Sequence, residues 1–231
     1  KERIADSVYE FIFTTPRPVP YAAGQYMAWT VPHAHADQRG WRRYFTLASS
    51  PSESVLRLGL KMYKPSSTFK QRLLTLAPGQ AIVASERDGD FTLPKAQQTK
   101  LAFIAGGIGV TPFRSIVQYC LDQHENRSMI LLYASQTVGD IAYRDIFDAA
   151  EQQLGMKTIY VLGDESKVPG DWTGEHGRIT AEMVKRHIPD YRERLFYISG
   201  PEAMVRAYKR LLASMGISSR RIKTDYFPGF A

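Results

Sequence analysis

The chain has 231 residues, a formal net charge of +7 and a single cysteine, Cys120. One thiol excludes an internal disulfide, a structural zinc site and an iron–sulfur cluster, since each of these needs several ligands. Any redox chemistry in this chain must therefore be organic. The positive excess lies mostly in residues 1–99, which hold 13 Lys and Arg against 8 Asp and Glu. Its dispersal among apolar residues argues against nucleic-acid binding.

The chain lacks the signals of membrane insertion and secretion. No segment approaches the 18 or so apolar residues of a membrane span, and the N-terminus has no signal-peptide core. We therefore expect a cytoplasmic protein. The chain begins without Met and directly in a strand-like segment, so a missing N-terminal domain, membrane-associated or of ferredoxin type, stays an open interpretation.

The first hundred residues have the pattern of a β domain. Short apolar or alternating runs are separated by turns rich in Pro and Gly, which predicts strands. The runs cover residues 8–13, 26–31, 45–48, 56–62 and 81–85. Many short strands at this spacing are typical of a barrel or a sandwich. One helix interrupts them, with Ser67 or Thr68 as N-cap and Phe69 and Leu73 at helical spacing.

From residue 101 onward, apolar strands alternate with amphipathic helices. The strands are expected at residues 101–105, 129–134, 158–162, 195–199 and 222–227. Helices are expected up to residue 121, near 141–154, near 181–187 and up to 215. This alternation predicts βαβ units and a parallel sheet. We place the boundary so that residues 1–96 form one domain and residues 97–231 the other.

A glycine-rich turn lies between the first of these strands and its helix. The motif consists of Gly106, Gly107, Gly109, Val110, Thr111 and Pro112. Glycines allow a ligand to approach the backbone, and the N-terminus of the helix offers N–H groups to a phosphate. The alternative is a tight turn without a ligand, because the spacing is not the usual dinucleotide fingerprint.

A second motif, Arg43-Tyr44-Phe45-Thr46, lies on a strand of the first half. An Arg can hold a pyrophosphate, an aromatic ring can stack on a flat heterocycle, and a hydroxyl can donate to a ring nitrogen. A strand with a surface Arg and core aromatics is the alternative. Some twenty residues later, Ser66-Ser67-Thr68 opens the only helix of this half and adds a second candidate anion site.

In this order, the motifs resemble the ferredoxin–NADP reductase superfamily of flavin reductases and oxygenase reductase components, and the resemblance covers nearly the whole chain. It implies a six-stranded antiparallel Greek-key β-barrel that binds FAD, followed by a five-stranded parallel α/β sandwich that binds NAD(P)H. By this likeness Arg43 binds the FAD pyrophosphate, Phe45 stacks on the isoalloxazine and Thr46 reaches N5.

The resemblance also assigns the remaining binding residues. The ribityl and phosphate region would be lined by Tyr44, Lys61 and Tyr63, and the flavin phosphate taken by Ser67 and Thr68. The turn from Gly106 to Pro112 would receive the NAD(P)H pyrophosphate and nicotinamide.

The second half carries further likenesses. Ser199-Gly200-Pro201 resembles the family's Cys-Gly-Pro turn near the nicotinamide, with Ser in place of Cys. Asp225 resembles a carboxylate near flavin N5, and Phe230 an aromatic cover of the ring. We therefore predict Thr46, Ser199 and Asp225 as catalytic residues.

Cofactor choice depends on Ser135-Gln136, since many NADP-binding relatives have an Arg at the position of Gln136. We therefore favour NADH over NADPH. No metal site is predicted, because His33 and His35 lack a third ligand.

Together these motifs indicate an FAD-dependent NAD(P)H oxidoreductase. Hydride would pass from nicotinamide C4 to flavin N5, and electrons would then leave to a separate acceptor, which is a redox partner protein, a quinone or a free flavin. The alternative is a non-catalytic module that binds FAD or a nucleotide for regulation.

Overall fold

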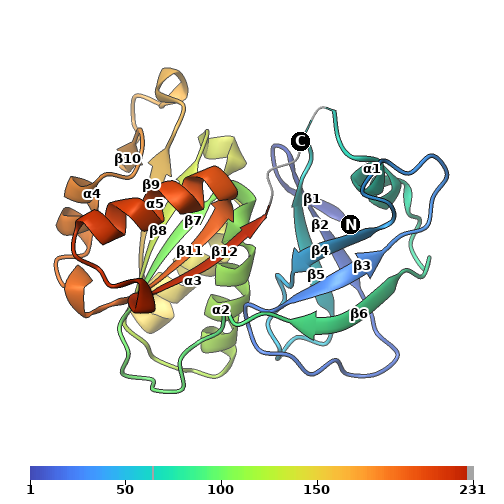
Figure 1. Ribbon diagram of the computed structural model, residues 1–231, viewed down its shortest axis with the longest axis horizontal. Helices are drawn as coiled ribbons and strands as arrows, with labels where there is room; N and C mark the ends of the chain where they lie inside the picture. Colours follow the sequence, from blue (N-terminus) through green and yellow to red (C-terminus); the bar gives the residue numbers. More distant parts are fainter. Residues whose placement is uncertain (64, 228–231) are drawn as a thin grey trace.

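The computed structural model describes residues 1–63 and 65–227, which form a β part and an α/β part side by side (Figure 1). The β part contains β1 (Glu2–Ala5), β2 (Val8–Phe13), β3 (Tyr26–Thr30), β4 (Arg42–Thr46), β5 (Leu56–Lys61), α1 (Thr68–Thr75) and β6 (Val83–Asp88). The six strands form two antiparallel three-stranded sheets, ordered β1-β2-β5 and β4-β3-β6.

The two sheets share one apolar core. Alternation along each strand turns one set of side chains inward, and Phe11, Met27, Trp29 and Leu58 meet there with Phe69 of α1. All five are nearly or fully buried. The core therefore holds β2, β3, β5 and α1 together, and β4, which carries the motif from Arg43 to Thr46, pairs with β3.

The α/β part is built on one parallel sheet. Its longer elements are β7 (Leu101–Gly106), α2 (Thr111–Asp122), β8 (Met129–Ser135), α3 (Arg144–Leu154), β9 (Lys157–Leu162), β10 (Glu175–His176), α4 (Ala181–His187), β11 (Leu195–Pro201), α5 (Glu202–Ser214) and β12 (Ile222–Phe227). Short 3₁₀ turns lie between them: η1 (Gly107–Val110), η2 (Val138–Asp140), η3 (Glu165–Lys167), η4 (Tyr191–Glu193) and η5 (Ser219–Arg221).

The strand order is β10-β9-β8-β7-β11-β12. The five long strands lie where the sequence predicts them, and the two-residue β10 adds a sixth strand at the edge beside β9. A two-residue strand of Glu and His has no apolar periodicity, so the sequence pattern could not show it.

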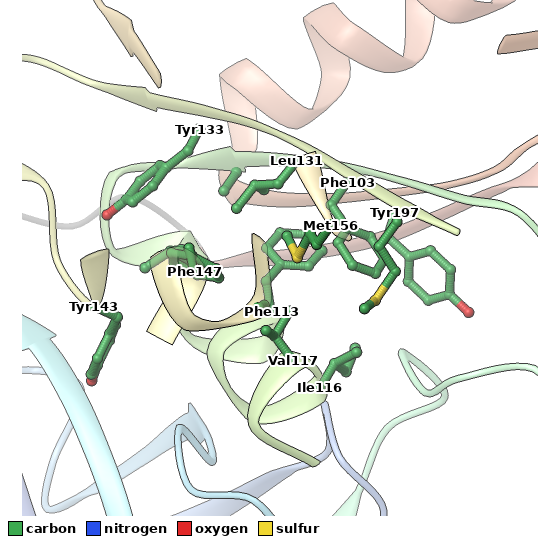
Figure 2. Packing of buried hydrophobic residues seen from close by; sticks show 14 of the residues in the cluster. Phe103, Phe113, Ile116, Val117, Leu131, Tyr133, Tyr143, Phe147, Met156 and Tyr197 are labelled. Atoms are coloured by element: carbon green, nitrogen blue, oxygen red, sulfur yellow. The ribbon is translucent and has the colours of Figure 1, made fainter. Parts of the chain in front are cut away.

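Alternate residues of the central strands pack on opposite faces of this sheet. Phe103 and Leu131 face α2 and α3, where they meet Phe113 and Phe147 (Figure 2). The other face, covered by α4 and α5, buries a separate apolar cluster. Burial on both faces explains why these strands read as continuous apolar runs. None of the described helices is long and apolar enough to cross a membrane.

The cluster around α2 continues into the β part. Val8, Ala23, Ala48 and Phe91 belong to the same buried cluster as Phe113. The two parts therefore meet through packed apolar side chains, and the groups on either side of the boundary hold fixed positions. The boundary proposed at residues 96 and 97 falls between β6 and β7.

Candidate functional site

A cavity of about 600 Å³ opens where the two parts meet. It is bounded by β4, β5 and the start of α1 on one side and by η1 and β12 on the other. The described residues that line it are Tyr26, Arg39, Arg42, Arg43, Tyr44, Phe45, Thr46, Gly59, Leu60, Lys61, Tyr63, Ser67, Lys70, Ile108, Thr111, Asp225 and Tyr226. Most of the flavin-binding residues predicted from the sequence are therefore brought to one space.

The lining carries a strong excess of positive charge. Five of the described lining residues are Arg or Lys, and Asp225 is the one acidic residue among them. A low-dielectric cavity with this imbalance attracts an anionic ligand. Because the cations come from β4, β5, α1 and the loop before β4, the imbalance arises only when the chain folds.

Arg43 is held tightly by its own neighbourhood. Its Nη1 donates to the carbonyl oxygens of Arg39, Gly40 and Arg42 at 2.7–2.9 Å, and its Nη2 bonds Asp37 Oδ1 at 2.7 Å. The Nε is buried and has no hydrogen-bond partner among the described residues. The guanidinium is thus rigid and keeps one donor unsatisfied beside the cavity.

The two residues predicted to bind the flavin phosphate, at the start of α1, have different surroundings. Ser67 is the N-cap, accepts from the backbone N–H of Lys70 at 3.4 Å, and lines the cavity. Thr68 does not line it. Its Oγ1 bonds His33 Nε2 at 3.0 Å and accepts from the backbone N–H of Asp37 at 3.0 Å. Thr68 thus fixes the loop before β4 instead of facing the cavity.

Lys61 is engaged across the boundary between the two parts. Its Nζ lies 2.8 Å from Asp140 Oδ1 in η2, although the side chain also lines the cavity. Burial tends to raise the pKa of Asp140, but the hydrogen bond and charge of Lys61 outweigh it and hold the pKa below its ordinary value. Tyr63 lies within 5.9 Å of Lys61 Nζ, measured to the ring centroid.

The two aromatic residues of the β4 motif lie in different environments. Phe45 packs on the core, with its ring centroid 5.7 Å from that of Phe69. Tyr44 is 61% exposed and meets Tyr26 edge to face at 5.9 Å. Both line the cavity, and so they offer it one partly buried and one exposed ring.

The three residues predicted as catalytic form one chain of contacts. Thr46 Oγ1 donates to Asp225 Oδ2 at 3.2 Å, and Ser199 Oγ donates to the same oxygen at 3.4 Å. Ser199 and Asp225 are register partners on β11 and β12. Burial raises the pKa of Asp225 above its ordinary value, although the two hydroxyls lower it in part. A carboxyl of this kind can hold a proton more readily than one in water.

The predicted nucleotide turns pack directly against each other. A Cβ on Gly109 would lie 2.5 Å from Gly200 Cα, and one on Gly106 would lie 2.1 Å from Met204 Sδ. Gly107 has φ +51° and open space around it. Glycine at Gly109 therefore lets the two backbones approach closely, whereas the neighbour of Gly106 is the side chain of Met204.

The rest of the turn and the cofactor-choice residues lie at the same edge of the sheet. Val110 and Pro112 are buried at the start of α2, and Thr111 and Ile108 reach the cavity. Ser135 is buried at the end of β8, and Gln136 follows it with an exposed side chain. Pro201 ends β11 after Gly200. Phe230 lies outside the described residues.

Sequence reasoning missed several residues of the cavity. Lys70, Arg39 and Arg42 contribute charge, and Tyr26 and Tyr226 contribute rings. Lys70 follows Ser67 by three residues, a spacing that places both on one side of a helix, so the sequence contained a usable signal. Arg39 lies in a loop whose path only the folded structure shows.

Comparisons with known proteins agree with this geometry. Residues 103–210 match the family model of the oxidoreductase NAD-binding domain. The cytochrome P450 reductase GcoB from Amycolatopsis superimposes with a TM-score of 0.85 at 25% identity, covering 98% of this chain and 67% of that one. The chain is similar to flavoprotein reductases of the ferredoxin–NADP reductase superfamily. The FAD/NAD-binding domain of a nitric oxide dioxygenase from Vibrio cholerae, 19% identical with a TM-score of 0.84, shares its fold over 98% of this chain and 94% of that one.

The curated relatives extend beyond the chain. A glycine betaine monooxygenase reductase subunit from Chromohalobacter salexigens is 25% identical over 226 residues, which is 95% of this chain and 60% of the relative. NADH-cytochrome b5 reductase 1 from Aspergillus terreus is 26% identical, over 96% of this chain and 77% of the relative. The chain therefore corresponds to about three fifths to three quarters of these relatives.

Proposed function

We propose that this chain is an FAD-dependent NAD(P)H oxidoreductase. In this proposal the cavity holds the flavin, and the turns at Gly106 and Gly200 receive the nicotinamide nucleotide. The observation that carries it is the contact of Thr46, Asp225 and Ser199, which brings a hydroxyl of the β part against a carboxyl and a hydroxyl of the α/β part. This is where two bound rings would have to meet.

The groups of the cavity suit a flavin dinucleotide. Arg43 keeps a buried Nε without a partner among the described residues, and five cations face one carboxylate. A diphosphate would neutralise this excess, and Arg donors match its oxygens. Phe45 and Tyr44 supply faces on which a flat ring system can lie.

A bound flavin supplies the redox chemistry, because its ring accepts hydride from a reduced nicotinamide and releases electrons to an acceptor. The residues of this chain bind, orient and manage protons. Thr46 and Ser199 direct their hydroxyls at the carboxyl of Asp225, and burial raises the pKa of this carboxyl, so that it takes up a proton more readily than a carboxyl in water. Packing around Gly109 and Gly200 fixes the distance between the two turns.

The visible absorption spectrum of the purified protein tests this proposal. We expect flavin bands near 370 and 450 nm, roughly, that bleach when NADH is added. Arg43→Ala should purify with little flavin, because it removes the cation that we assign to the pyrophosphate. A fully yellow Arg43→Ala protein contradicts that assignment. A flavin that NADH does not bleach contradicts the reductase and favours a regulatory FAD-binding module.

NADH is the proposed electron donor. Gln136 places a neutral side chain where a 2′-phosphate would need a fixed positive charge. The backbone N–H of Asp164 donates to Gln136 O at 3.0 Å, so an acidic residue also lies beside this position. Gln136→Arg should shift the ratio of kcat/KM values towards NADPH. An unchanged ratio would show that residue 136 does not select the cofactor.

We propose a redox protein as the electron acceptor. The named relatives include a monooxygenase reductase subunit and a cytochrome b5 reductase. The chain offers no second redox centre through Cys120, because burial raises the pKa of its thiol to about 12 and keeps it protonated. Steady-state NADH oxidation with a haem protein, a quinone and free flavin as acceptors separates the three possibilities.

A further inference from the structure

Lys70 places an ammonium group in the cavity near the start of α1. Its Nζ donates to the carbonyl oxygen of Lys61 at 2.7 Å and lies 5.0 Å from the centroid of the Tyr63 ring. No carboxylate of the described residues forms an ion pair with it. An ammonium group has three donors, so two remain for another partner.

The other cations of the cavity differ from Lys70. Arg43 is paired with Asp37, and Lys61 with Asp140. Arg42 is exposed and stacks over the ring of Tyr44 at 5.4 Å. Lys70 therefore combines partial burial with the lack of a carboxylate partner among the described residues.

This placement is costly for the protein without a ligand. Burial and, to a lesser extent, the nearby charge of Arg39 together lower the pKa of Lys70 to about 8. A partly buried cation without a counter-ion destabilises the folded state. An anion that binds beside it removes this cost, so the position suits a ligand that brings its own negative charge.

We propose that Lys70 binds a phosphate oxygen of the flavin dinucleotide at the end of the cavity formed by Ser67 and α1. The inference rests on the proposed flavin site. It adds a binding residue that lies outside the motif from Arg43 to Thr46 on β4. Lys70 lies three positions after Ser67, the N-cap of α1, and both line the cavity. Lys70 is thus a binding residue for the phosphate and not for the ring.

Flavins with and without phosphate provide the test. The apoprotein is titrated with FAD, FMN and riboflavin, and binding is followed by flavin fluorescence. We expect Lys70→Met to weaken FAD and FMN about 10- to 100-fold, because a charge-assisted hydrogen bond is lost. Riboflavin, which has no phosphate, should bind as in the wild type. Lys209→Met on the exposed side of α5 is the matched control and should change none of the three.

The pH dependence of binding gives a second readout. The groups around Lys70 are Arg39 and Arg43 on the loop before β4 and on β4, their partner Asp37, and Lys61 with Tyr63 at the end of β5. Since the phosphate favours protonated Lys70, wild-type affinity for FAD should fall as the pH rises above about 8. Lys70→Arg should restore binding and flatten this dependence, because a guanidinium does not titrate there.

The outcomes separate the inference from the function on which it rests. Equal weakening of FAD, FMN and riboflavin by Lys70→Met would show a structural role and overturn the inference. Unchanged FAD affinity in Lys70→Met, with normal binding by the wild type, would overturn it alone. A wild-type protein that binds none of the three flavins would overturn the proposed function together with it.

Discussion

At the boundary between the two parts, buried charges are paired with each other. Arg114 on α2 bonds Glu53, and Arg57 on β5 bonds Glu53 at 2.6 Å and Glu10 at 2.5 Å. Arg114 also donates to Ala48 O at 3.0 Å. Burial tends to raise the pKa of Glu53, but the hydrogen bonds and charge of Arg114 outweigh it and hold the pKa below its ordinary value.

The cavity beside this boundary has the opposite arrangement. Arg43 and Lys61 are paired with carboxylates that do not line it, but Lys70 has no carboxylate partner among the described residues. Lys70 and Asp225 both have pKa values shifted towards the neutral form. Charges that are satisfied within the protein stabilise the docking of its two parts. Charges that are not satisfied cost stability and are kept where a ligand can use them.

Removal of Arg114, the cation at the boundary, should have the largest effect on stability. Arg114→Met leaves Glu53 with one fewer partner and Ala48 O unsatisfied, so we expect the free energy of unfolding to fall by about 3–5 kcal/mol. Urea denaturation measures it. Arg206→Met, which breaks an exposed ion pair with Glu202, is the control and should cost under about 1 kcal/mol.

The loss of stability in acid tests the same ion pair between Arg114 and Glu53. The pKa of folded Glu53 lies below its unfolded value, so its stabilising contribution is complete above the unfolded pKa and is lost as the pH falls through the folded pKa. Wild-type protein should therefore lose stability in acid more steeply than Arg114→Met. Parallel pH profiles of the two proteins would contradict the role of this pair.

A substitution at the contact between the two nucleotide turns should have the next largest effect on stability. Gly109→Ala puts a Cβ 2.5 Å from the backbone of Gly200, which should cost about 3 kcal/mol and weaken NADH binding. Gly107→Ala meets open space at φ +51°, so it should cost only about 1–2 kcal/mol of backbone strain. Denaturation midpoints and KM for NADH compare the two. Equal losses would show that the close approach is unimportant.

In the cavity, replacement of a cation by Met should raise the stability of the protein, whereas at the boundary it should lower it. Lys70→Met should raise the stability of the apoprotein by roughly 1 kcal/mol, because it removes a partly buried cation without a counter-ion. The folded pKa of Lys70, about 8, lies below the unfolded value of about 10.4. Wild-type stability should therefore rise between these pH values, and Lys70→Met should lack this rise. Lower apoprotein stability in Lys70→Met would refute the comparison.

Asp225→Asn should give the smallest change in stability, with a separate loss of activity. Because burial raises the folded pKa of Asp225, ionisation destabilises the fold as the pH rises through the ordinary and then the folded pKa. The Asn variant should therefore be about 0.5 kcal/mol more stable at neutral pH. NADH oxidation should fall about 100-fold if the carboxyl manages a proton, with flavin content unchanged. Normal turnover would remove Asp225 from the proposed mechanism.

Much of the fold could be predicted from local pattern. The five long strands of the parallel sheet, the N-cap at Ser67 and the turn before Pro112 depend on periodicity and capping within a few residues. β10 escaped prediction, because its two residues pair only through their neighbour β9.

The candidate site shows the same limit. The motif of Arg43 and Thr46 was visible in sequence because its members are adjacent. Lys61 and Thr68 fit the family pattern, yet their polar groups bond Asp140 and the loop before β4. Whether a polar side chain faces a ligand or a neighbour depends on segments that lie far apart in the chain.

By itself the sequence determined that a β part precedes an α/β part, because strand and helix periodicity are local properties of the chain. Tertiary structure alone decided which charges are neutralised. It brought Glu53 to Arg114 and Thr46 to Asp225, and it left Lys70 in the cavity without a carboxylate partner among the described residues. The reason is that the cost of a charge depends on burial and on partners, and both are set by segments that meet only in the folded protein.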